Sequence, residues 1–133
     1  MASILKQAVL PVSPAQAWAA LRDVGHAHRM FPGVLVDCRM DGEFRVVTFA
    51  NGLVVRERIV TIDDESRRFA YAIVRDDLAH HSASMQVIPD AACCRFVWWT
   101  DILPDSSAER LEAAMALGVE AIQRRFAIRN SSE

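Results

Sequence analysis

Glu57 is the polar residue of this sequence whose setting points most clearly to chemistry. Residues 55–59 read Val-Arg-Glu-Arg-Ile, and the alternation of a strand places Val55, Glu57 and Ile59 on one face and both arginines on the other. If that face is concave, the carboxylate points into an apolar cavity, where burial raises its pKa unless a donor or cation lies nearby. Glu57 is therefore a candidate ligand anchor or acid/base group. The alternative is a carboxylate outside any cavity, paired with Arg56 or Arg58 of a neighbouring strand.

Two further strands carry hydroxyl groups that could face the same space. Tyr71 shares a strand face with Phe69, and an inward tyrosine supplies an aromatic wall and a hydroxyl that needs a partner. Both ligand contact and core packing with the hydroxyl bonded to Glu57 remain open. Ser82 and Ser84 share a face of the next strand, and we expect them to face the cavity, the alternative being ordinary surface residues.

The histidines raise the question of a metal. His26 and His28 lie in a predicted turn, and His80 and His81 are adjacent on a strand. A zinc site needs three or four converging ligands, and adjacent strand residues point to opposite faces. We therefore predict no metal site and keep His81 as a second candidate for acid/base chemistry. The sequence holds no phosphate-binding loop and no Ser/His/Asp order, so no cofactor is predicted and covalent catalysis has no support.

The remaining candidate ligand contacts are apolar or aromatic. Trp98 and Trp99 must face opposite ways, one toward the interior and the other toward the convex face or a dimer contact. Trp99 is the one that we assign to the ligand site. On other elements the candidates are Val36, Met115, Val119 and Ile122.

The elements that would position these residues follow from turns, caps and periodicity. Residues 4–12 form a strand, and Ser13 with Gln16 is typical of a capping box that begins a helix. A short second helix follows through residues 28–30. Six strands are then predicted at residues 34–40, 44–49, 53–62, 69–74, 81–88 and 95–103. Ser106 with Glu109 predicts a second capping box, before a long helix with one apolar stripe that ends near residue 126.

Composition places limits on the partners. The chain has 133 residues and a formal net charge of −2, with 52% hydrophobic and 24% charged residues. We expect one domain at residues 1–128, with a frayed tail at 129–133. The charge disfavours nucleic acid, and no apolar run is long enough to insert into a membrane. Three cysteines do not form a disulfide framework, and with no signal-peptide pattern they suit a cytoplasmic location.

Six consecutive hairpin-linked strands form an antiparallel sheet that curls, and the final helix can bury its stripe only on the concave face. Certain residues stand out along this order of elements: Val12-Ser13-Pro14 with Trp18 and Leu21, Phe31-Pro32-Gly33, Glu57-Arg58-Ile59 with Asp63-Asp64, and the region of Trp98. On these residues the chain resembles the SRPBCC, or START-like, superfamily of helix-grip proteins, and its polyketide cyclase/dehydrase and lipid transport branch in particular. The resemblance implies an α+β fold in which a curved seven-stranded antiparallel sheet wraps around the long C-terminal helix, with two short helices after the first strand. One departure is Met30, where many relatives carry an aromatic residue before the proline.

Three functions remain open. The first is binding of a small hydrophobic molecule, polyketide-, lipid- or aromatic-like, between the sheet and the last helix. The alternative is a cyclase or dehydratase that uses Glu57 or His81 as its acid/base group. The second alternative is a protein-interaction module with a closed interior, and a monomer and a homodimer are both compatible with the sequence. A cavity above roughly 300 Å³ would favour the first two functions.

Overall fold

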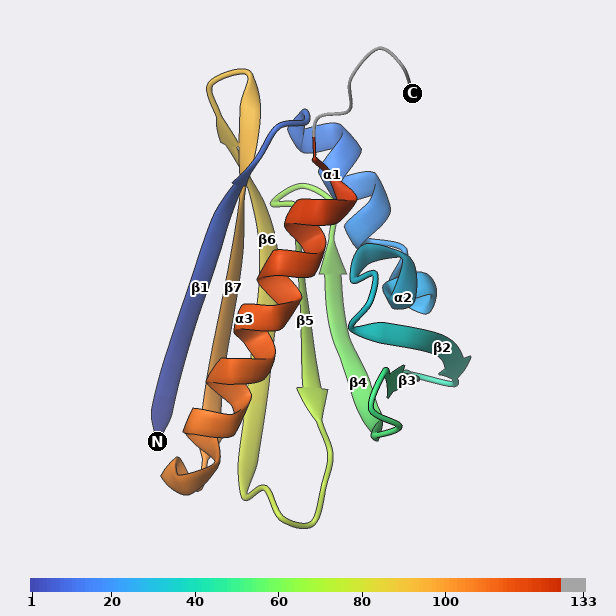
Figure 1. Ribbon diagram of the computed structural model, residues 1–133, viewed down its shortest axis with the longest axis vertical. Coiled ribbons are helices and arrows are strands. Elements are labelled where there is room, and N and C mark those ends of the chain that lie inside the picture. The colour runs from blue at the N-terminus through green and yellow to red at the C-terminus, as the bar shows by residue number, and fades with distance from the viewer. Residues whose placement is uncertain (128–133) are drawn as a thin grey trace.

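The computed structural model describes residues 1–127, and the predicted tail at 129–133 lies outside this range (Figure 1). Seven strands form one antiparallel sheet in the order β1-β7-β6-β5-β4-β3-β2. The strands are β1 (Ala2–Leu10), β2 (Leu35–Asp41), β3 (Phe44–Phe49), β4 (Val54–Asp63), β5 (Arg68–Ile73), β6 (His80–Asp90) and β7 (Cys93–Leu103). The helices are α1 (Pro14–Leu21), the short 3₁₀ helix η1 (Val24–His26), α2 (Ala27–Met30), the 3₁₀ turn η2 (Asp105–Ser107) and α3 (Ala108–Arg125).

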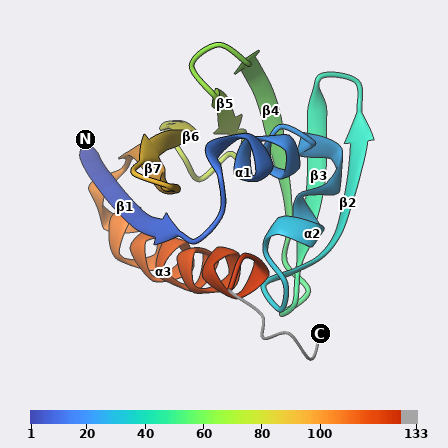
Figure 2. The same ribbon diagram turned by 90° about the horizontal axis from the view of Figure 1, so that it is seen from above.

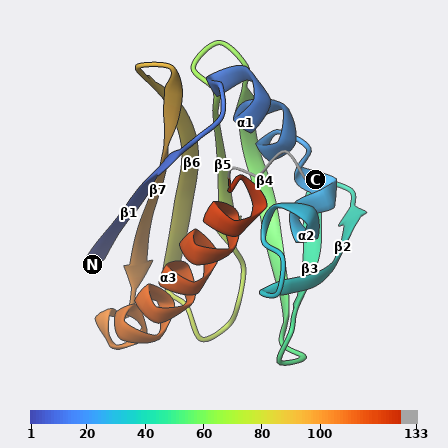
Figure 3. The same ribbon diagram turned by 45° about the horizontal axis from the view of Figure 1, so that its top comes forward.

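The sheet curves around one side of α3, as the view from above shows (Figure 2). The long helix packs against β1 and, near its C-terminal end, against α2. It approaches the far half of the sheet, β3 to β5, less closely. The helix α1 packs against β6 and β7 at one end of the sheet, and α2 packs against β2 (Figure 3). The predicted helix-grip architecture is confirmed. Side chains of α3 and of the strands β3 to β5 line the pocket that is described below.

The first helix is fixed at both ends by polar contacts. The Ser13 hydroxyl accepts a hydrogen bond from the Gln16 backbone N–H at 3.2 Å, which confirms the predicted capping box. The Trp18 indole N–H and the Arg22 guanidinium both donate to Asp64, at 2.9 and 2.7 Å, in the turn between β4 and β5. These contacts hold α1 across the end of the sheet.

The predicted capping box at Ser106 is wrong. The chain first forms the 3₁₀ turn η2, in which the Ser107 backbone N–H donates to the Pro104 carbonyl at 3.0 Å. The helix α3 therefore begins one residue later than the box requires, and its N-cap, Ser107, makes no side-chain capping bond.

The hairpin between β3 and β4 sets the register of the strands that matter most here. The loop that contains Asn51-Gly52 has three residues, 50–52, as the predicted strands at 44–49 and 53–62 leave it. The Phe49 N–H donates to the Leu53 carbonyl at 2.8 Å, and Gly52 adopts φ 92°, a left-handed conformation that glycine tolerates best. This loop places Arg45 opposite Glu57, whereas a two-residue loop would place it opposite Arg58.

Candidate functional site

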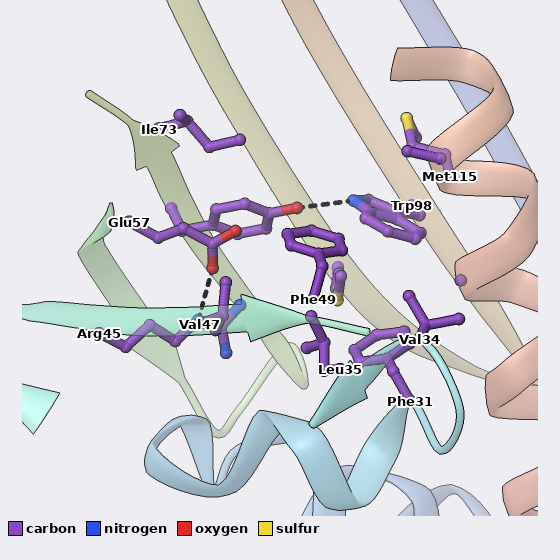
Figure 4. Close-up of a pocket in the computed structure, with 14 residues that line it drawn as sticks. Phe31, Val34, Leu35, Arg45, Val47, Phe49, Glu57, Ile73, Trp98 and Met115 are labelled. Atoms are coloured by element: carbon purple, nitrogen blue, oxygen red, sulfur yellow. Dashed lines mark hydrogen bonds and ion pairs between the residues drawn. The ribbon is translucent and has the colours of Figure 1, made fainter. Parts of the chain in front are cut away.

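A pocket lies between the concave face of the sheet and α3 (Figure 4). Its open volume is about 70 Å³, so the pocket does not reach the roughly 300 Å³ at which a cavity was expected to favour ligand binding or catalysis. The wall is apolar except for one ion pair and a few polar groups. The lining residues are Phe31, Val34, Leu35, Arg45, Val47, Phe49, Glu57, Tyr71, Ile73, Met85, Trp98, Ala114, Met115 and Gly118.

The ion pair joins Arg45 of β3 to Glu57 of β4. Arg45 Nε donates to Glu57 Oε1 at 2.6 Å, and the two side chains are 5% and 9% exposed. Arg45 also donates through Nη1 to the Val24 carbonyl at 3.3 Å, and its guanidinium carbon lies 5.3 Å from the ring centres of both Phe69 and Tyr71. Burial is the strongest single effect on Arg45 and lowers its pKa, but the opposing effects of its neighbours, the charge of Glu57 first among them, together raise the pKa, so the guanidinium stays charged.

The partner of Glu57 corrects the sequence prediction. Glu57 does face inward with Val55, as the strand alternation predicts, and Arg56 and Arg58 face outward. The alternative of a pair with Arg56 or Arg58 outside the cavity is wrong, because these arginines bind exposed carboxylates on the convex side. The buried partner is Arg45, which lies opposite Glu57 in the register of β3 and β4.

Tyr71 closes the next part of the wall. The Trp98 indole N–H donates to the Tyr71 hydroxyl oxygen at 3.0 Å, so the predicted hydroxyl bond to Glu57 is replaced by one to Trp98 (Figure 4). Burial, together with the charge of Glu57, raises the pKa of Tyr71 far above its ordinary value. The phenol therefore keeps its proton, and its O–H remains a hydrogen-bond donor.

His81 is buried but is not a lining residue of the pocket. Its Nδ1 accepts a hydrogen bond from the Ile73 backbone N–H at 2.9 Å, and its ring lies against Tyr71, with 5.8 Å between ring centres. Burial, aided by the charge of His80, lowers the pKa of His81 to about 4. The imidazole is thus neutral at pH 7 and supports Tyr71 from outside the pocket wall.

The other predicted site residues fall into two groups. Among those that face inward, Glu57, Tyr71 and Met115 line the pocket. The rest of the inward group belongs to the core around the pocket without lining it: Val55, Phe69 and Ile122 are buried, and Ile59 and Val119 are partly buried.

Four predicted contacts point the other way. On β6 the inward residues alternate through Ala83, so Ser82 and Ser84 lie on the convex face, and the expectation that they face the cavity is wrong. Trp99 is 44% exposed on the same convex face, and its neighbour in the chain is the inward tryptophan. Val36 is 57% exposed because the pairing of β2 is irregular between residues 35 and 37, so that Leu35 lines the pocket in its place.

Sequence reasoning missed Arg45, Trp98 and Gly118. Arg45 has the same strand parity as Val47, which was a readable signal of an inward side chain. Gly118 leaves room for Trp98, since a Cβ there would lie 2.7 Å from Trp98 Cζ3. That close approach depends on the packing of α3 on β7, which no local pattern indicates.

Within residues 1–127, no group of three or more His, Cys, Asp and Glu side chains is arranged to hold a metal ion. No helix in the same range has the length and apolar character needed to cross a bilayer.

The curved sheet, the long helix and the pocket between them define a START-like, helix-grip protein of the SRPBCC superfamily. The sequence profile of the family "Polyketide cyclase / dehydrase and lipid transport" matches residues 1–130, and the chain belongs to that family. None of the curated protein sequences matches the chain.

Solved structures show the same fold at low sequence identity. An uncharacterized protein from Bacillus thuringiensis matches with a TM-score of 0.85 at 17% identity, over 96% of this chain and all of that one. A START superfamily protein from Mycobacterium smegmatis has a TM-score of 0.75 at 9% identity, covering 93% and 96%. Norcoclaurine synthase from Thalictrum flavum, in complex with dopamine and hydroxybenzaldehyde, has a TM-score of 0.68 at 16% identity, covering 92% and 84%.

Proposed function

We propose that this protein binds a small, largely apolar molecule in the pocket between the sheet and α3. The observation that carries the proposal is the Arg45–Glu57 pair in an otherwise apolar wall. A buried ion pair is weak evidence for stability, because the loss of hydration often exceeds the attraction between the charges. Anchoring the polar end of a ligand would explain why a buried ion pair is present here, whereas a contribution to stability would not. The aromatic molecules held by norcoclaurine synthase, which has the same fold, are the kind of ligand that we propose.

The size of the pocket limits the ligand. Its 70 Å³ is about half of an engineered cavity of ~150 Å³ that takes benzene, so a ring-sized ligand requires side chains to move. Val34 and Phe49 are the candidates, because both are half-exposed and both also line a neighbouring surface groove of about 260 Å³. Rotation of these two side chains would join the groove to the pocket and provide both an entrance and the missing volume.

A second candidate function, favoured by the position of Glu57, is cyclase or dehydratase chemistry. A carboxylate beside a charged guanidinium can remove a proton next to a carbonyl group while the guanidinium stabilises the enolate oxygen. The proton would pass to Glu57 and the negative charge to the oxygen facing Arg45. This function uses the same pocket, so binding is tested first.

The test is a titration with toluene, followed by amide and indole NMR signals. Binding in the pocket shifts the Trp98 indole N–H and the Gly118 amide and leaves the exposed Trp99 indole unchanged. Ala114→Phe fills the pocket from α3 and should abolish these shifts, whereas Ala113→Phe, on an exposed position of the same helix, should retain them. Unchanged pocket signals at saturating toluene, or equal shifts in Ala114→Phe, would overturn the proposal.

A further inference from the structure

The Arg45–Glu57 pair leaves one polar atom of each partner unused. Elsewhere, Arg22 binds Asp64 through two hydrogen bonds, Nε to Oδ1 and Nη2 to Oδ2. Arg45 and Glu57 make only the Nε–Oε1 bond, and among the described residues Arg45 Nη2 and Glu57 Oε2 have no hydrogen-bond partner. Neither atom is sealed from open space, because His28 Nδ1 is the one fully enclosed side-chain N or O in residues 1–127 that lacks a partner. Both side chains line the pocket, so these two atoms are available to a ligand.

The shape of the guanidinium determines the direction of the free N–H groups on Arg45 Nη2. A guanidinium is a rigid planar fork in which Nε–H and one N–H of Nη2 point in the same direction. Because Nε–H of Arg45 is directed at Glu57 Oε1, the parallel N–H of Nη2 is directed past the same carboxylate. The ion pair therefore carries one free hydrogen-bond donor on Arg45 and one free acceptor on Glu57, two residues joined by a hydrogen bond in an otherwise apolar wall.

The charges at this point cancel. Among the described residues that line the pocket, Arg45 and Glu57 form the one ion pair, and Tyr71 keeps its proton. A carboxylate ligand would place a second anion against Glu57 in a buried site, where like charges repel strongly and lost hydration is not recovered. A neutral ligand with a carbonyl oxygen and an adjacent N–H or O–H would satisfy both atoms without added charge.

We propose that the Arg45–Glu57 pair makes the pocket selective for neutral molecules whose polar end carries a carbonyl oxygen next to an N–H or O–H group. Primary amides and hydroxy ketones belong to this class, and carboxylates of the same shape are rejected. This inference rests on ligand binding in the pocket as proposed above, and it adds the chemical class of the ligand and the residues that select it.

The experiment compares benzamide with benzoate at pH 7, which have nearly the same shape and differ in charge and in the N–H donor. The Trp98 indole and Gly118 amide signals report binding. We expect benzamide to bind with a Kd at least about tenfold lower than that of benzoate, as a like-charge contact in a buried interface predicts. Equal affinity, or tighter binding of benzoate, overturns the selectivity while shifts with toluene still support the binding pocket. If toluene also leaves the pocket signals unchanged, the binding proposal fails and the selectivity fails with it.

A charge variant identifies the responsible residue. Glu57→Gln keeps the side-chain shape and gives the pocket a net positive charge, so benzoate should gain at least about tenfold relative to benzamide. Asp41→Asn is the matched control, because it removes the same charge from an exposed pair with Arg56 on the convex side. An unchanged ratio in a folded Glu57→Gln protein overturns the role of Glu57. If that variant does not fold, the ratio measured with the unmodified protein decides by itself.

Discussion

The Arg45–Glu57 pair makes a quantitative prediction about stability. Glu57→Leu removes the carboxylate and leaves a guanidinium that is only 5% exposed, with the Val24 carbonyl and two aromatic ring faces as its remaining partners. An unpaired buried charge costs about 3–5 kcal/mol, and each ring face offsets roughly 0.5–1 kcal/mol. We therefore expect the free energy of unfolding to fall by about 3 kcal/mol, which is roughly 10 °C in Tm for a domain of this size.

A double variant shows whether the loss of stability comes from the unpaired charge or from the loss of the ion pair itself. Arg45→Met combined with Glu57→Leu replaces both charges with apolar side chains of similar volume, and its unfolding free energy should lie within about 1 kcal/mol of the unmodified protein or above it. Urea unfolding followed by tryptophan fluorescence measures all three proteins. Asp41→Leu, which breaks an exposed ion pair on the convex face, is the control and should change the midpoint far less than Glu57→Leu.

Two outcomes would refute this reasoning. A loss below about 1 kcal/mol in Glu57→Leu would mean that the guanidinium reaches water easily, so the site is not buried. A double variant as unstable as the single one would mean that the pair is needed for the fold itself. The second outcome would also remove the main reason for assigning the pair to a ligand.

Three further predictions concern the walls around this pair. The neutral His81 has a pKa of about 4 against an unfolded value near 6.5, so the unfolded state binds more protons between these values. The contribution of His81 to the free energy of unfolding should be fully present above pH 6.5 and fall by roughly 3 kcal/mol toward pH 4. Thermal melts at different pH values measure this dependence, and His81→Asn should lack it. Gly118→Ala should lower Tm despite its better helix propensity, because the new Cβ meets the Trp98 ring at 2.7 Å, and an unshifted Trp98 indole signal would contradict this. Tyr71→Phe removes the acceptor of the Trp98 N–H and should cost about 1–3 kcal/mol in chemical unfolding; a neutral result would mean that water replaces the hydroxyl.

Local patterns in the sequence were enough to predict the architecture. The capping box at Ser13 and the order of the strands depend on neighbours in the chain, and both are present in the structure. The inward position of Glu57 followed from the same alternation, since Val55 fixes which face of β4 is apolar.

The errors concern the partner of Glu57 and the choice of the inward tryptophan, which depend on strand register and on contacts between distant residues. A loop of two residues in place of 50–52 would set Arg58 opposite Arg45, so the partner of Glu57 follows only once the register of β3 and β4 is known. Adjacent tryptophans give no local sign of which one is inward, because both are large and apolar. The choice of Trp98 depends on the space that Gly118 leaves on α3, a contact between distant parts of the chain.

The most direct test of the central claim is native mass spectrometry of the protein purified from its own host. The account predicts a retained organic molecule, neutral and small, in the unmodified protein and in Ala113→Phe, and its absence from Ala114→Phe, in which the pocket is filled. Two results would contradict ligand binding in this pocket. One is that none of the three proteins retains a molecule, and the other is that Ala114→Phe retains it as well as the unmodified protein does.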